Sequence, residues 1–175
     1  MSIEQFFALS QGNWKSMRSS HSLAFQDFED IKSNIKIKEL NLLDKSVLKL
    51  NQILNKTDNH PACAIKIDWN SSNEWDPEEK ASQGETILIA VPHSDNQGIF
   101  LRSKGYIEEN QSISTYNLIK EDSLTLQTSY KSTITEERIW FVSSNVRCRY
   151  SLVKSINKSA IFQTSFSSEI RIIND

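Results

Sequence analysis

Residues 124–172 read LTLQTSYKSTITEERIWFVSSNVRCRYSLVKSINKSAIFQTSFSSEIRI, and their pattern decides the fold. Apolar and polar residues alternate through this stretch with a period near two, which is typical of β-strands. The polar breaks at residues 143–144 and 157–159 have the length of hairpin turns. The stretch therefore predicts consecutive antiparallel strands, over Leu124–Lys131, Ile134–Val142, Asn145–Ile156 and Ala160–Ile172.

The same pattern continues toward the N-terminus. Period-two runs also cover Trp14–Phe28 and Ile31–Leu40. Four more strands are expected, at Ala62–Trp69, Glu85–Val91, Gly98–Ile107 and Ser112–Lys120. Because hairpin-length breaks separate most of these segments, the strands are expected to follow one another as an antiparallel meander.

Two segments predict helices instead. Ser2 and Gln5 fit a capping box ahead of an apolar face, and Gly12 is placed to end that helix. The residues Val47–Leu54 favour a second, short helix. A chain that is otherwise nearly all strand must protect its sheet edges, and closing into a barrel does so. We therefore expect one mostly β domain over residues 1–175, an antiparallel barrel of eight to ten strands that can enclose one small ligand.

Composition excludes several classes of function. With 20 basic and 22 acidic residues, the chain offers no electrostatic reason to expect nucleic acid or an anionic membrane as partner. No apolar run approaches the roughly 18 residues that span a bilayer, and residues 1–10 lack a signal pattern, so a cytoplasmic protein is expected. Two distant cysteines and three scattered histidines predict neither a disulfide framework nor a metal site.

Arginine is scarce in this chain, with six arginines against fourteen lysines. Two of the six, Arg147 and Arg149, lie two residues apart in an expected strand with Ser151 on the same face. Arg18 belongs to an early strand that would meet the last one if the barrel closes. Arginine binds a carboxylate through two donors, which lysine does not reproduce. The arginines are therefore either ordinary surface residues or part of an interior for an elongated dicarboxylic ligand.

Aromatic and acidic residues add to that second interpretation. Glu136 lies in the strand before the expected turn at residues 143–144, on the face it shares with Trp140. On that interpretation, an interior with the arginines, this glutamate and tryptophans would suit an elongated, conjugated dicarboxylic ligand. Trp69 and Trp75 flank a polar loop and are either packing residues or a flat wall at the mouth of the barrel.

Five stretches, taken in order, resemble the S-type phycobiliprotein lyases, the CpcS/CpeS family. They are GNWKSMRSSH at 12–21, IDWNSSNEWD at 67–76, TEERIWF at 135–141, NVRCRYS at 145–151 and SEIR at 168–171. The resemblance implies a lipocalin-like or fatty-acid-binding-protein-like barrel of about ten strands with an N-terminal helix. It also implies a lyase that binds a linear tetrapyrrole and attaches it through a thioether bond to a cysteine of a phycobiliprotein subunit.

The resemblance further implies a role for named residues. Glu136 and His21 are the expected catalytic residues, with Glu136 facing the pyrrole nitrogens of the bilin. The expected bilin-binding residues are Arg18, Trp69, Trp75, Arg147, Arg149 and Ser151. The arginines would hold the propionates and the tryptophans would pack against the rings. Because neither Cys63 nor Cys148 has neighbours that would activate it, the nucleophile is expected to belong to the acceptor protein.

Phycoerythrobilin is the expected substrate, with phycocyanobilin as the alternative, and no metal or permanently bound cofactor is expected. The acceptor would be a phycobiliprotein subunit, the β subunit of phycoerythrin, in a phycobiliprotein-containing cell or the host of its phage. A homodimer and a pairing with a paralogous lyase subunit are both left open. Two other functions are also left open, a non-catalytic bilin or lipid carrier and a subunit of a heteromeric lyase.

Overall fold

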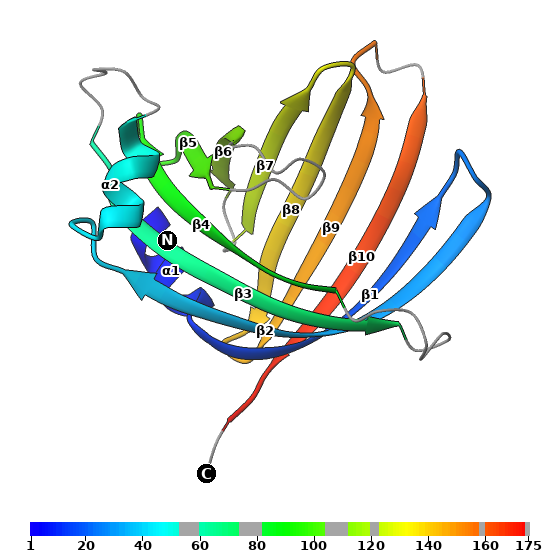
Figure 1. The fold of residues 1–175 in the computed structure, drawn as a ribbon, viewed down its shortest axis with the longest axis horizontal. Coiled ribbons are helices and arrows are strands. Elements are labelled where there is room, and N and C mark those ends of the chain that lie inside the picture. The colour runs from blue at the N-terminus through cyan, green and yellow to red at the C-terminus, as the bar shows by residue number, and fades with distance from the viewer. Residues whose placement is uncertain (53–59, 74–81, 104–111, 120–122, 158–159, 174–175) are drawn as a thin grey trace.

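Ten antiparallel strands form a closed barrel in the computed structural model (Figure 1). The structure describes residues 1–52, 60–73, 82–103, 112–119, 123–157 and 160–173. The strands are β1 (Gly12–Ser22), β2 (Asp27–Leu40), β3 (Cys63–Asn73), β4 (Ser82–Pro92), β5 (Gln97–Arg102), β6 (Ser112–Ile119), β7 (Ser123–Tyr130), β8 (Thr133–Ser143), β9 (Val146–Ser155) and β10 (Ile161–Arg171). Each strand pairs with its neighbours in sequence, and β1 pairs with β10 to close the barrel, which confirms the predicted antiparallel barrel.

The first predicted helix is confirmed as α1 (Ile3–Ser10). The second is α2 (Lys45–Asn51), which begins two residues before the predicted range, and residues 53 and 54 of that range lie outside the described residues. The Ser2 hydroxyl accepts a hydrogen bond from the Gln5 amide, and the Gln5 side chain accepts one from the Ser2 amide. Gly12 then leads from α1 into β1 with φ of 123°. A Cβ atom at Gly12 would lie 2.7 Å from the Nη1 atom of Arg171, so this connection requires glycine both for its φ angle and for space.

The period-two run over Trp14–Phe28 predicts strand throughout, whereas the chain turns back on itself at residues 23–26 between β1 and β2. This turn, LAFQ, contains none of the glycine, proline, asparagine or aspartate residues that usually mark a hairpin. Gln26 takes the positive φ angle, 54°, that such a turn needs. The sequence therefore carried no ordinary signal for this hairpin.

Apolar side chains fill one end of the barrel. Helix α1 lies there, and Phe6 and Phe7 are buried in a cluster that also contains Trp14, Phe100 and Tyr116. Helix α2 covers the outer face of β3 to β5 with a separate cluster. Hydrophobic burial of this kind is the main stabilising contribution to a domain. Since the α1 end is filled, the remaining interior lies toward the other end, where the β1–β2 and β7–β8 hairpins flare outward (Figure 1).

Arg171, at the end of β10, joins α1 to the barrel. Its guanidinium donates hydrogen bonds to the carbonyl oxygens of Leu9, Gln11 and Ser144, and it lies 4.2 Å from the centre of the Trp14 ring. Burial lowers the pKa of Arg171 from its usual value.

None of the described helices has both the length and the apolar character needed to cross a bilayer.

Candidate functional site

A cavity of about 430 Å³ occupies the part of the barrel that the apolar core leaves open. Its volume falls in the range of roughly 300–1,000 Å³ that is usual for small-molecule sites. A compartment of about 140 Å³ adjoins it and shares part of its wall. The charged side chains of the larger wall are Arg18, Arg102, Arg147, Arg149, Glu137 and Glu169. Four arginines against two glutamates leave an excess of two positive charges, which suits a ligand with two carboxylates.

Strand register brings Arg18 and Arg149 to one face of the cavity. Arg149 on β9 lies opposite Ser167 on β10, and Ser167 lies opposite Arg18 on β1. Residues that lie directly opposite in an antiparallel pair share a face, so both arginines point into the barrel. Two strand spacings separate their backbones, about 10 Å. The pairing of β1 with β10 therefore brings two arginines that are 131 positions apart in the sequence to the same part of the cavity wall.

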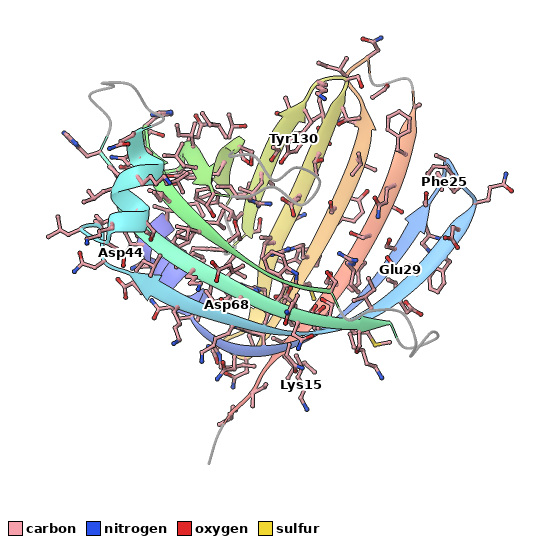
Figure 2. The ribbon with its side chains drawn as sticks, viewed as in Figure 1. Lys15, Phe25, Glu29, Asp44, Asp68 and Tyr130 are labelled. Atoms are coloured by element: carbon pink, nitrogen blue, oxygen red, sulfur yellow. The ribbon has the colours of Figure 1, made fainter. Side chains whose placement is uncertain are left out.

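Arg18 has hydrogen-bond donors that are available to a ligand. One Nη atom lies 3.7 Å from a carboxylate oxygen of Glu29, and both of these side chains are more than one third exposed. The Nε atom of Arg18 is buried and has no hydrogen-bond partner among the described residues. Figure 2 labels Glu29, which lies on β2 toward the open end of the barrel.

Glu137 is the buried carboxylate nearest to these arginines. It is 8% exposed, with one oxygen 3.8 Å from an Nη atom of Arg102 and the other 4.0 Å from an Nη atom of Arg149. Both contacts are longer than a hydrogen bond. A carboxylate held in this way keeps its charge balanced while its oxygens stay within reach of N–H donors from a ligand. Neither Glu137 nor Arg102 was predicted from the sequence to line the site.

The expectation that Glu136 faces the arginines is wrong. Its carboxylate lies outside the barrel, 2.6 Å from the ammonium group of Lys154. A regular turn at residues 143–144 would place Glu136 on the face of Arg147 and Arg149. The hairpin instead contains a bulge, because Phe141 pairs with Arg147 whereas Ser143 pairs with Val146. The extra residue, Val142, reverses the facing of β8 relative to β9 and turns Glu137 inward.

The other predicted site residues divide into three groups. Arg18, Trp69, Arg147, Arg149 and Ser151 line the two compartments of the cavity. His21 does not, because it is exposed and lies on the outer face with its ring 4.9 Å from that of Phe28. Because His21 follows Arg18 by three residues, strand alternation places the two side chains on opposite faces of β1. Trp75 lies outside the described residues.

Trp69 has room in the cavity wall because a glycine lies opposite it. Trp69 on β3 pairs with Gly84 on β4. A Cβ atom at Gly84 would lie 2.4 Å from the Cζ2 atom of the Trp69 indole. The flat ring therefore covers the position where a side chain of β4 would otherwise stand, and it presents an aromatic surface to the cavity.

Arg147 is committed to a buried ion pair at the base of the cavity. Its Nε atom donates a hydrogen bond of 2.6 Å to Glu169, and one of its Nη atoms contacts the same carboxylate oxygen. The guanidinium also lies 4.9 Å from the centre of the Trp14 ring. Glu169 is 1% exposed and was not singled out in the sequence analysis, although it lies within SEIR and falls on the same face as Ser167. The spacing of two residues between Ser167 and Glu169 was the sequence signal that both side chains share one face of β10.

Neither cysteine is prepared to act as a nucleophile. Burial raises the pKa of Cys63 to about 12, and the charges of Glu4 and Glu39 act in the same direction. Burial also raises the pKa of Cys148. Both thiols therefore stay protonated at neutral pH. Since unfolding would release Cys63 to ionise near its ordinary value of 9.0, this thiol favours unfolding as the pH rises from about 9 toward 12.

If the chain carries out the bilin transfer that the resemblance implies, we expect Cys63→Ala and Cys148→Ala to transfer at the wild-type rate, because both thiols stay protonated at neutral pH. The measurement is the initial rate of covalent product at pH 7.5 with each variant and the acceptor protein. Iodoacetamide should label both cysteines slowly in the folded protein and rapidly in urea. A variant that unfolds at the wild-type urea concentration yet loses transfer would contradict this prediction.

Among the described residues, no group of three or more histidine, cysteine, aspartate or glutamate side chains is arranged to hold a metal ion. The described side chains of the site offer arginines, glutamates and an aromatic wall. Such side chains can bind carboxylates through the arginines, stack on a flat conjugated ring through the indole and accept N–H groups through a buried carboxylate.

Comparison with known proteins supplies the family. The CpeS-like protein family matches residues 2–172, nearly the whole chain. The chain belongs to the CpeS-like family. A chromophore lyase of the CpcS/CpeS type from Trichodesmium erythraeum is a family relative, 38% identical over 173 residues, covering 98% of this chain and 99% of the relative. These matches confirm the expected family and the chromophore-lyase class.

Three other proteins that are similar to this CpeS-like chain are also lyases by name. The S-type phycobiliprotein lyase from Guillardia theta has a solved structure that matches with a TM-score of 0.86 and 28% identity, covering 100% of this chain and 95% of that one. A relative from Picosynechococcus, 32% identical over 97% of this chain and 85% of its own length, is named a phycocyanobilin lyase subunit. A relative from Microchaete diplosiphon has phycoerythrobilin lyase in its name and is 34% identical over 89% of this chain and 70% of its own length.

Proposed function

We propose that this protein binds phycoerythrobilin in the barrel and attaches it through a thioether bond to a cysteine of a phycobiliprotein subunit, the β subunit of phycoerythrin. The observation that supports this most is the cavity wall with four arginines and two glutamates, because its charge excess matches the two propionates of a bilin. The family of the chain supports the reaction class.

Arg18 and Arg149 hold the two propionates in this proposal. They lie on one face of the cavity, about two strand spacings apart, and each guanidinium offers paired donors to a carboxylate. Ser151 adds a hydroxyl beside them in the smaller compartment. Arg147 serves a different purpose, because its contacts with Glu169 fix the base of the cavity on which the ligand rests.

Glu137 faces the pyrrole-type nitrogens of the bound bilin. Its buried carboxylate accepts their N–H groups, and this interaction favours the protonated, cationic bilin, which is the better acceptor for a thiolate. The indole of Trp69 packs against a ring of the bilin and restricts its twist. Holding one conformer in this way directs the acceptor to a single carbon and excludes wrong additions.

The transfer step is an addition and needs no oxidant or reductant. The acceptor thiol loses its proton, and its sulfur forms a C–S bond to the exocyclic carbon of the ring A ethylidene. The π bond of the ethylidene breaks, its electron pair enters the conjugated system, and the ring carbon takes up one proton. The protein supplies position and charge, while the nucleophile comes from the acceptor, since Cys63 and Cys148 stay protonated.

The test mixes the purified protein separately with phycoerythrobilin and with phycocyanobilin, and then adds the β subunit of phycoerythrin without chromophore. Absorbance follows binding, fluorescence follows transfer, and denaturation in acidic urea distinguishes covalent product from loose adduct. We expect a shifted spectrum with each bilin and a fluorescent covalent product, formed faster with phycoerythrobilin than in the absence of this protein.

Other results would redirect or reject the proposal. Binding without transfer would indicate a carrier, or a subunit that requires a paralogous partner, as the name of the Picosynechococcus relative suggests for that protein. Faster transfer of phycocyanobilin would reassign the substrate. No spectral change with either bilin would reject the cavity as a bilin site.

A further inference from the structure

We infer that exposed apolar side chains beside the cavity mouth form the surface on which the acceptor protein docks. We call this surface the mouth patch; it consists of Leu23, Phe25, Phe28, Ile156, Ile161 and Phe162. The inference rests on the proposed function, since it concerns the partner that must bring its cysteine to the bound bilin.

The β1–β2 hairpin supplies half of the mouth patch. Phe25 is 85% exposed and projects from the tip of this hairpin (Figure 2). Leu23 and Phe28, on either side of it, are each about half exposed. These three residues make no contribution to either apolar cluster of the barrel. Their exposure therefore is not a by-product of core packing.

The start of β10 and the turn before it supply the other half. Ile156, Ile161 and Phe162 are all exposed there. The backbone amide of Leu23 donates a hydrogen bond of 2.8 Å to the carbonyl oxygen of Phe162, so the two halves are held side by side. Exposed apolar residues are ordinary when scattered singly. Six of them on two adjoining hairpins, in the turns and the strand ends beside them, are typical of an interaction surface.

The position of the mouth patch identifies its occupant. Helix α1 and its apolar cluster fill the opposite end of the barrel. The wall of the cavity extends toward the flared end, where it includes Tyr130, Val153 and Gln163, and Gln163 adjoins Phe162 of the mouth patch. A cysteine that is to reach a bilin in this cavity approaches from that end. The partner that needs to bind beside the mouth is therefore the acceptor protein, through an apolar surface next to its reactive cysteine.

The test uses a double variant, Leu23→Ser with Phe25→Ser. Neither Leu23 nor Phe25 lines the cavity. We expect its affinity for phycoerythrobilin to match that of the wild type. The KM for the acceptor protein should rise at least tenfold, whereas the slow addition of N-acetylcysteine to the bound bilin should be unchanged. The matched control is Leu43→Ser, which removes a leucine that is 78% exposed in the turn after β2, at the opposite end of that strand.

The outcomes separate this inference from the function itself. If the wild-type protein transfers bilin to neither thiol, the proposed function fails. If the wild type transfers and the double variant keeps the wild-type KM for the acceptor, the mouth patch is not the docking surface. An unchanged KM combined with loss of a homodimer in sedimentation would assign the patch to a second copy of the chain. An unchanged KM combined with loss of binding to phosphatidylcholine vesicles would assign it to a lipid surface, and either result overturns the inference.

Discussion

Replacing Glu137 with glutamine is expected to lower the rate of bilin transfer by roughly 100-fold or more, the usual size of a lost electrostatic interaction with the transition state. The amide keeps the shape of the side chain between Arg102 and Arg149 but removes its charge and its ability to exchange a proton. Binding of phycoerythrobilin should change much less than the rate, because in the proposed function the propionates are held by Arg18 and Arg149, which this variant retains. The measurement is single-turnover transfer with saturating bilin, together with a binding titration.

Glu136→Gln is the matched control for this experiment. The two glutamates are adjacent in sequence, but the bulge at Val142 places Glu136 on the outer face with Lys154. Transfer by Glu136→Gln should therefore stay within about twofold of the wild type, since this pair lies on the outer face and Glu136 does not line the cavity. Loss of transfer in Glu136→Gln with normal transfer in Glu137→Gln would show that the catalytic role assigned to Glu137 is wrong.

Replacing Glu169 with alanine is expected to destabilise the protein by about 3–5 kcal/mol, the usual cost of removing one partner of a buried ion pair. The reason is that Arg147, which is 3% exposed, would keep its charge without the carboxylate that balances it. Urea unfolding followed by tryptophan fluorescence measures the effect. Glu29→Ala, which removes a carboxylate from the solvent-exposed pair with Arg18, should cost at most about 1 kcal/mol.

The double variant Arg147→Met, Glu169→Leu distinguishes a lost charge partner from a lost side chain. Replacing both members of a buried pair with apolar residues of similar size is often neutral or stabilising. We expect the double variant to unfold at a higher urea concentration than Glu169→Ala. If Glu169→Ala cost less than about 1 kcal/mol, or if the double variant were the less stable of the two, the ion pair would not be the element that fixes the base of the cavity.

The general fold could be predicted from the sequence because its strands obey one simple rule. Alternation with a period of two marks most of them, and the polar breaks between them mark most of the hairpins. The β1–β2 turn was the exception, because LAFQ carries no residue that favours a positive φ angle and Gln26 adopts one regardless. Tertiary pairing along the whole of β1 and β2 overrides that local preference.

The site was harder to predict because it depends on which face of each strand points inward. Alternation sorts residues within one strand, and it correctly grouped Arg147, Arg149 and Ser151. The facing of one strand relative to the next depends on the turn between them, and a single extra residue reverses it. That residue, Val142, has no sequence signal of its own, so Glu136 rather than Glu137 was expected on the face of the arginines. Arg102 was missed because it comes from β5, far in sequence from the other arginines.

Closure of the barrel by its first and last strands has a consequence for synthesis of the protein. Trp14 pairs with Arg171, so the seam joins residues 157 positions apart. While the ribosome is still making the chain, β1 has one edge with no partner, and an unpaired edge is a template for aggregation. The seam forms only after β10 has left the exit tunnel, and such long-range pairing is intrinsically slow. The nascent chain is therefore exposed to aggregation until β10 has emerged, and low growth temperature or a bound chaperone should raise the yield of folded protein.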